Sequence, residues 1–149
     1  MRLLVIGAGG VGSAMVSIAA RRNVFEEIVV ADVDGDRAAR AATQANATAG
    51  HDRVRSAKVD ASFRVQLVEL ARSTRADVIV NACDPRFNPP IFEAAFAAGC
   101  HYLDMAMNLS VPHPTDPYNT PGVMLGEAQW AAASPVSYTH LTLPTIYSV

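Results

Sequence analysis

The chain has 149 residues, of which 50% are apolar and 17% are charged, and its formal net charge at pH 7 is −2. This length is sufficient for one domain with its own core, and the composition is too apolar for an intrinsically disordered chain. With 12 basic against 14 acidic residues, the sequence has no excess of positive charge to neutralise a phosphate backbone. We therefore expect a globular protein that does not bind nucleic acid.

The two cysteines, Cys83 and Cys100, are too few for a four-ligand zinc site. A domain of this size needs no disulfide, so we expect two free, buried thiols and no metal site. The apolar start at residues 3–6 is too short for the apolar part of a signal peptide or for a membrane span. The sequence therefore predicts a cytoplasmic protein that does not enter a membrane.

Short apolar runs predict five β-strands, and amphipathic stretches between them predict four helices. The strands are expected at residues 2–6, 28–31, 54–59, 78–82 and 101–105. The helix faces expected to be buried are lined by Val11, Met15, Ile18 and Ala19, by Ala38, Ala41, Ala42 and Ala45, by Phe63, Leu67, Leu70 and Ala71, and by Ile91, Ala94, Ala95 and Ala98. Ser62 is expected to cap the third helix and Gly99 to end the fourth. This alternation predicts an α/β fold with a doubly wound parallel sheet in the order 3-2-1-4-5.

The first predicted strand is followed at once by GAGGVG, which fits the pattern G-x-G-x-x-G and opens the first predicted helix. In this context Gly7 permits the tight turn, Gly9 lets a diphosphate approach the backbone, and Gly12 lets the helix pack against the strand. Gly10 and Val11 belong to the helix N-terminus, whose unpaired N–H groups attract anions. The motif predicts dinucleotide binding in a Rossmann fold; the alternative is a glycine-rich turn without a ligand.

Asp32 lies twenty residues after Gly12, at the end of the second predicted strand. An acidic residue at this place accepts hydrogen bonds from the adenosine ribose hydroxyls. A 2′-phosphate would bring like charges to within about 4 Å of each other, so Asp32 favours NAD over NADP as the cofactor. Arg37 and Arg40 could pair with such a phosphate, although solvated helix charges are the other interpretation.

The ends of the later strands carry the remaining candidate residues. Ligands of open α/β sheets bind beyond the carboxyl ends of the strands. We therefore expect Asp60 and Ala61, after the third strand, and Asn81 and Ala82, at the end of the fourth, to contact the cofactor. Asp104, at the end of the fifth strand, is the candidate for substrate contact. Helix caps and turn formers are the alternative for the polar residues, and the pattern assigns no catalytic base.

The alternation stops after residue 107, where four prolines follow within residues 112–121. We expect residues 1–110 to form the dinucleotide-binding domain and the irregular, proline-rich residues 111–135 to lead toward a substrate domain. Residues 136–145 resemble translated sequencing adapter, so residues 136–149 are interpreted as a non-native tail. An ordinary threonine-rich tail is the alternative.

From Met1 to about residue 133, the sequence resembles the NAD(P)-binding domain of the saccharopine dehydrogenase family. The stretches that carry the resemblance are GAGGVGS at residues 7–13, IVVAD at 28–32, VDA at 59–61, DVIVNA at 77–82 and HYLD at 101–104.

This resemblance implies an oxidoreductase that transfers hydride at the C–N bond of a secondary amine or imine, with an amino-acid or polyamine-type substrate. It also implies a further domain that supplies most of the substrate pocket and the homodimer contacts, so that this chain alone is inactive. A regulatory module that senses NAD without catalysis is the alternative of a different class.

Overall fold

The computed structural model describes residues 1–105, 111–123, 127 and 131. The strands are β1 (Arg2–Ile6), β2 (Glu27–Asp32), β3 (Val54–Lys58), β4 (Val78–Asn81) and β5 (His101–Asp104). The helices are α1 (Gly10–Ala20), α2 (Gly35–Ala49), α3 (Arg64–Ser73) and α4 (Asn88–Ala98), with a short 3-10 helix, η1 (Pro85–Phe87), before α4. The predicted alternation of strands and helices is confirmed.

The five strands form one parallel sheet in the order β3-β2-β1-β4-β5, as predicted. β1 is central: Ile6 lies opposite Ala31 of β2 on one side and Asn81 of β4 on the other. From β1 the chain first adds β2 and β3 on one side, and it then returns to add β4 and β5 on the other side. A crevice beyond the carboxyl ends of the strands at such a point is where open α/β sheets bind ligands.

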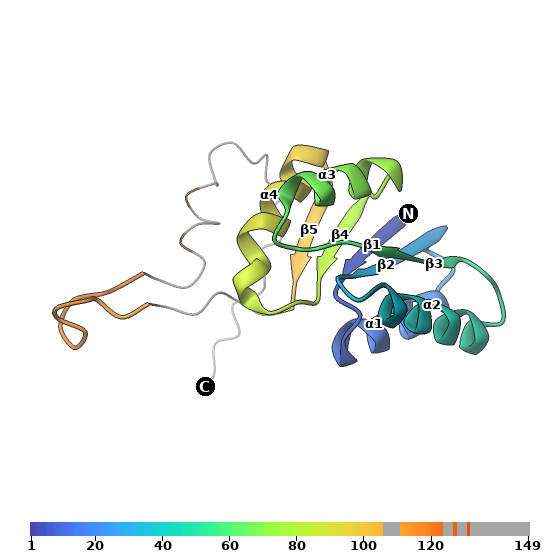
Figure 1. The fold of residues 1–149 in the computed structure, drawn as a ribbon, viewed down its shortest axis with the longest axis horizontal. Coiled ribbons are helices and arrows are strands. Elements are labelled where there is room, and N and C mark those ends of the chain that lie inside the picture. Colours follow the sequence, from blue (N-terminus) through green and yellow to red (C-terminus); the bar gives the residue numbers. More distant parts are fainter. Residues whose placement is uncertain (106–110, 124–126, 128–130, 132–149) are drawn as a thin grey trace, which may run out of the picture.

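Helices cover both faces of the sheet, α1 and α2 on one and α3 and α4 on the other (Figure 1). Successive side chains of a strand point to opposite faces, so β1 contributes to two cores. Leu3 and Val5 pack with α1 and α2, whereas Leu4 and Ile6 pack with α3 and α4. Since both faces are covered, β1 is apolar from Leu3 to Ile6, which explains why this run shows no alternation.

The buried face of α1 differs in part from the predicted one: Ala19 is buried and Met15 packs against the core as predicted, but Val11 and Ile18 do not. Val11 and Ile18 are 60% and 50% exposed, and the face against the sheet is formed by Gly12, Val16, Ala19 and Ala20. The physical reason is the close approach of α1 to the strands, which is why three of these four residues are glycine or alanine. Because α1 also carries apolar residues on its outer side, periodicity alone could not identify the inner face.

The start of α3 also differs from the prediction. Phe63, and not Ser62, occupies the N-cap position, and it makes no side-chain capping bond. Phe63 is 55% exposed and does not join the buried face of the helix, whereas Leu67 and Ala71 do. Gly99 ends α4 in the left-handed conformation with φ 74°, as predicted.

Beyond β5, the described residues include an antiparallel bridge between Val111 and Val123. The expected tail at residues 136–149 lies outside the described residues, and the domain boundaries at residues 110 and 135 stay predictions. None of the helices in the described ranges is long and apolar enough to cross a membrane.

Candidate functional site

Two glycines of the turn between β1 and α1 are required by close packing. Gly7 has φ +102°, and a Cβ added to it would lie 2.8 Å from the carbonyl oxygen of Ala82. A Cβ on Gly12 would lie only 1.9 Å from the carbonyl oxygen of Gly7. A larger residue at Gly7 would therefore clash with the chain after β4, and one at Gly12 would push α1 away from the turn. These contacts explain two of the three glycines of the motif without a ligand.

Gly9 is different, because nothing in the described structure requires a glycine there. Its φ of −69° is open to any residue, and a Cβ at this position would meet no atom within 4 Å. The missing side chain instead leaves open space beside the first turn of α1. This is the arrangement expected where a ligand approaches the backbone closely.

The N-terminus of α1 is not neutralised by its own residues. Among the described residues, no side chain caps this helix, and its first turn contains no acidic residue. The N–H groups of a first turn lack acceptors within the helix, so this end carries a partial positive charge. The Ser13 hydroxyl donates to the Ala8 carbonyl at 2.8 Å and so holds the turn in place. The site is therefore suited to an anion.

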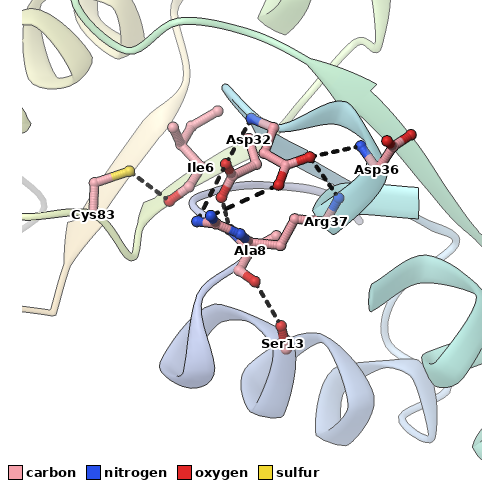
Figure 2. Close-up of polar contacts among 8 residues, drawn as sticks. Ile6, Ala8, Ser13, Asp32, Asp36, Arg37 and Cys83 are labelled. Carbon is pink, nitrogen blue, oxygen red and sulfur yellow. Dashed lines mark hydrogen bonds and ion pairs between the residues drawn. The ribbon is translucent and has the colours of Figure 1, made fainter. Parts of the chain in front are cut away.

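Asp32 is bound to the turn directly. Its Oδ2 accepts the N–H of Ala8 at 2.8 Å, and its Oδ1 accepts the N–H of Asp34 at 2.9 Å (Figure 2). The residue is 7% exposed, so both oxygens are held in fixed positions at the end of β2. A carboxylate oxygen has two lone-pair sites, so each can still accept a hydrogen bond from a ligand.

Arg37 reaches back from the first turn of α2 to the same place (Figure 2). Its Nη1 lies 3.7 Å from Asp32 Oδ1, and its Nη2 lies 3.7 Å from Asp34 Oδ2. Asp34 also caps α2, because its Oδ1 accepts the N–H groups of Asp36 and Arg37 at 3.0 Å each. These N–H bonds, that of Arg37 first, lower the pKa of the Asp34 carboxyl.

A cavity of about 460 Å³ lies at this edge of the sheet. Its lining consists of Ile6, Gly7, Gly9, Asp32, Val33, Arg37, Val59, Asp60, Ala61, Ser62, Ala82, Cys83, Asp84 and Phe87. The cavity joins the open space at Gly9 to the Asp32 carboxylate. The donor set therefore fits a dinucleotide, with helix amides for a diphosphate and an anchored carboxylate for a ribose.

Two further acidic residues shape the turns around the cavity. Asp60 Oδ1 accepts the N–H of Ser62 at 2.9 Å, and Asp84 Oδ1 accepts both the N–H and the Nε–H of Arg86 at 2.9 Å. The hydrogen bonds from Arg86 lower the pKa of the Asp84 carboxyl. Asp60 thus forms a turn, the alternative weighed for it, and it also lines the cavity.

Asn81 lies beneath this edge and is buried. Its Nδ2 donates to Asn88 Oδ1 at 2.7 Å and to the Tyr102 hydroxyl at 3.3 Å. Its Oδ1 accepts the N–H of Cys83 at 2.9 Å. The amide therefore connects the end of β4 to the start of α4, to β5 and to the turn that forms one wall of the cavity.

Asp104 ends β5 in register with Asn81. Burial is the first cause that raises the pKa of Tyr102, and the Asp104 carboxylate raises the pKa further. The phenol therefore stays protonated. Asp104 does not line the cavity of about 460 Å³.

The Cys83 thiol faces the cavity from the turn after β4. Its Sγ–H donates to the carbonyl oxygen of Ile6 at 3.4 Å (Figure 2). Burial, together with the charges of Asp32 and Asp84, raises the pKa of Cys83 to about 11. The group is therefore a neutral thiol at physiological pH. Both cysteines are free, as expected, but they are half-buried rather than buried.

The structure brings six of the predicted site residues to one cavity: Gly7, Gly9, Asp32, Asp60, Ala61 and Ala82. The predicted residues that do not line it are Gly10, Val11, Gly12, Asn81 and Asp104. Sequence reasoning also expects Cys83 and Asp84, which follow the fourth strand, to line this crevice, and both do so. It missed Phe87, which lines the cavity from the end of η1 and so lies outside the strand-end pattern. Within the described part of the chain, no group of His, Cys, Asp and Glu could hold a metal ion.

Comparison with known proteins agrees with this geometry. Residues 3–138 match the family model of the saccharopine dehydrogenase NADP binding domain. Carboxyaminopropylagmatine dehydrogenase from Synechocystis is 30% identical over 105 residues, which is 70% of this chain and 25% of that protein. Carboxynorspermidine synthase from Vibrio cholerae is 28% identical over 116 residues, covering 74% of this chain and 28% of that protein.

Among solved structures, apo saccharopine dehydrogenase (L-Glu forming) from Saccharomyces cerevisiae shares the fold with a TM-score of 0.59 and 16% identity. The match covers 76% of this chain and 22% of the yeast chain. The matched part of this chain thus amounts to about a quarter of the length of its curated relatives. Since the family model covers most of the sequence, the chain belongs to the family of saccharopine dehydrogenase NADP binding domains.

Proposed function

We propose that this chain is the cofactor-binding domain of an NAD(P)-dependent oxidoreductase that acts on the C–N bond of a secondary amine or imine. The observation that carries the proposal is the open space at Gly9, which the fold does not require and which joins a cavity beside the anchored Asp32 carboxylate. In the finer assignment, Asp32 favours NAD over NADP, because a 2′-phosphate beside it would add like charge.

The first turn of α1 is the diphosphate site in this proposal. The N–H groups of Gly9, Gly10 and Val11 donate to the diphosphate oxygens, and the positive end of the helix dipole adds to the attraction. Gly7 and Gly12 act indirectly, by allowing the close packing that holds these amides in place. A bound nicotinamide cofactor supplies the hydride chemistry, for which the protein provides binding and orientation.

The residues at the other strand ends have separate roles. Asp32 accepts the ribose hydroxyls, while Asp60, Ala61 and Ala82 form the wall of the cavity. Asn81 is buried, so we assign it the task of holding the turn at Cys83 rather than direct contact with the cofactor. Asp104, which ends β5 in register with Asn81, is the proposed contact for the substrate.

The names of the relatives support an amino-acid or polyamine-type substrate. One is a dehydrogenase of carboxyaminopropylagmatine and the other a carboxynorspermidine synthase, and both names favour an enzyme over a sensing module. Because the relatives are about four times as long as the matched part, we propose that a further domain supplies the substrate pocket and the homodimer contacts. This chain alone then binds cofactor without turnover. A cytoplasmic location remains a prediction.

Calorimetric titration of the chain with NAD and with NADP tests the proposal. We expect saturable one-to-one binding of at least one of them, and loss of that binding in Gly9→Val, which fills the open space beside α1. If neither nucleotide binds to a folded chain, the assignment as a cofactor-binding domain is wrong.

A further inference from the structure

We infer that residues 111–123 form an arm that two copies of this chain exchange, each copy placing Tyr118 in an apolar groove on α1 of the other copy. The inference goes beyond the proposed function, since the arm and the groove both lie outside the lining of the cofactor cavity. These contacts are additional to those that we assign to a further domain.

The groove lies along the exposed side of α1 and has a volume of about 620 Å³. Its lining includes Val11, Ala14 and Ile18, and no residue of α1 is charged. Val11 and Ile18 are each at least half exposed. A surface helix normally presents charged or polar side chains on its outer side, and an apolar patch there marks an interaction surface.

The arm is held in shape by its own residues. At its base, Val111 and Val123 exchange backbone hydrogen bonds at 3.2 and 2.9 Å. In its centre, the Asp116 carboxylate accepts the Asn119 amide at 2.9 Å and the Thr120 hydroxyl at 3.0 Å. Four prolines within residues 111–123 restrict the backbone further. The arm is therefore preorganised and loses little conformational entropy when it binds.

Tyr118 is the side chain of the arm that matches the groove. It is 95% exposed, and Figure 1 shows the arm, in orange, standing away from the sheet and its helices. A tyrosine offers a large apolar ring at a low cost in rotamer entropy, which is why this residue is enriched at interfaces. The ring would fill the groove while its hydroxyl stays at the rim.

The charges of the arm and the groove are opposite. Arg22 is the one charged residue of the groove lining. It is exposed, and no acidic side chain within the described ranges pairs with it. Asp116, two positions before Tyr118, is the one acidic residue of the arm, which contains no lysine or arginine. This complementarity makes a second copy of the chain the occupant that we assign to the groove.

Twofold symmetry lets the same contact form twice. In such a dimer each arm meets the groove of the other copy, so that both grooves are filled and no further copy is recruited. A groove that takes one aromatic side chain makes a small interface, which places the dimer in the weak class whose population depends on protein concentration.

Sedimentation analysis of the whole chain from about 5 µM to about 500 µM tests the inference. We expect a reversible equilibrium between monomer and dimer. Tyr118→Ala removes the aromatic anchor, and Ile18→Glu places a charge in the groove. Each should raise the dissociation constant of the dimer at least about tenfold.

Phe96 and Val65 provide matched controls, because they are exposed apolar residues on α4 and α3. Phe96→Ala and Val65→Glu should each change the dissociation constant by less than about twofold. The charge is tested in the same way. Arg22→Glu should weaken the dimer about threefold to tenfold, and Arg21→Glu, an exposed neighbour outside the groove lining, by less than about twofold.

A mixture of the Tyr118→Ala and Ile18→Glu chains distinguishes arm exchange from other modes of association. In a mixed pair, the intact Tyr118 of one copy faces the intact groove of the other. We therefore expect mixed dimers that are weaker than the wild-type dimer but form at concentrations where neither variant dimerises alone. Thermal denaturation of each variant establishes that it is folded.

A wild-type chain that remains monomeric at about 500 µM would overturn the inference. A dimer that Tyr118→Ala leaves intact would have another interface and would overturn it as well. The same holds if the mixed variants associate no better than each does alone, or if a control weakens the dimer as much as its counterpart. Calorimetric titration of Tyr118→Ala with NAD should match that of the wild-type chain, so failure of this inference leaves the proposed function standing.

Discussion

The Asp32 carboxylate accepts the N–H of Ala8 at 2.8 Å across 24 positions of sequence. This hydrogen bond ties the end of β2 to the glycine turn after β1. The second carboxylate oxygen accepts the N–H of Asp34, where the chain turns toward α2. Asp32, the predicted ribose acceptor, therefore also holds the glycine turn, the predicted diphosphate site.

Replacing Asp32 should consequently affect both parts of the site. For Asp32→Ala we expect NAD to bind about tenfold more weakly, because ribose hydrogen bonds are lost and the glycine turn is no longer held. The gap between NAD and NADP should narrow, since a negative charge is removed. The free energy of unfolding should fall by about 1–3 kcal/mol, because the buried N–H of Ala8 loses its acceptor. Calorimetry and urea denaturation measure the two effects.

Asp36 is the control for this variant, because it is an exposed acidic residue in the first turn of α2 and does not line the cavity. Asp36→Ala should leave the affinity for NAD nearly unchanged. An Asp32→Ala chain with an unaltered ratio of NAD to NADP affinity would count against the ribose role.

The sheet could be predicted because each step of that prediction depends on local sequence. Apolar runs mark buried parallel strands, and the short connections and the handedness of crossovers leave few possible strand orders. Gly7 and Gly12 followed from the same context, since their lack of a side chain is a packing requirement. The strand ends were then predictable ligand positions, which is why Asp32 and Ala82 line one cavity.

The remaining features depend on contacts between distant residues. The inner face of α1 could not be predicted, because small residues rather than the largest apolar ones face the sheet. The burial of Asn81 could not be predicted either, since its partners Asn88 and Tyr102 are 7 and 21 positions away. Such a network has no sequence period, and it becomes visible only when β4, α4 and β5 are packed together.

Substitution by valine should affect folding at Gly12 but only ligand binding at Gly9. A Cβ added to Gly9 meets no atom within 4 Å. For Gly9→Val we therefore expect the free energy of unfolding to change by less than about 1 kcal/mol while dinucleotide binding is lost. Gly12→Val places its Cβ 1.9 Å from the Gly7 carbonyl oxygen, so we expect loss of the folded state. Circular dichroism melts and calorimetry distinguish the two results.

Ala14→Val is the control, because Ala14 is exposed on α1 and lies outside the cavity lining. It should fold and bind as the wild-type chain does. If the Gly9→Val chain retains its affinity for both dinucleotides, the diphosphate does not lie at the first turn of α1.

The buried amide of Asn81 should contribute strongly to stability. Asn81→Ala removes the hydrogen bonds to Asn88 and Tyr102 and the acceptor for the Cys83 N–H. We expect the free energy of unfolding to fall by about 2–4 kcal/mol, because polar groups that had been paired are left without partners. The exposed Asn23 is the control, and Asn23→Ala should change stability by less than about 0.5 kcal/mol. Equal effects of the two substitutions would contradict a structural role for the network.

The thiol of Cys83 should make the protein less stable at alkaline pH. Its pKa is raised from 9.0 to about 11 in the folded chain, mainly by burial. As the pH rises from 9 toward 11, the unfolded chain releases this proton while the folded chain keeps it. The unfolded state therefore binds fewer protons, so the free energy of unfolding falls with rising pH in this window. Below pH 9 the thiol is protonated in both states and its contribution is constant.

Cys83→Ala removes this one titration and leaves those of Cys100 and Tyr102, whose pKa values are also raised, in place. Urea denaturation of both chains at several pH values from 7 to 11 measures the difference. We expect the wild-type chain to lose about 1 kcal/mol more than the variant above pH 9, a value reduced by solvent screening of a half-buried group. Parallel curves for the two chains would mean that the thiol ionises in the folded protein as readily as in the unfolded one. Cys83 would then be open to water rather than enclosed between the turn after β4 and the carbonyl of Ile6.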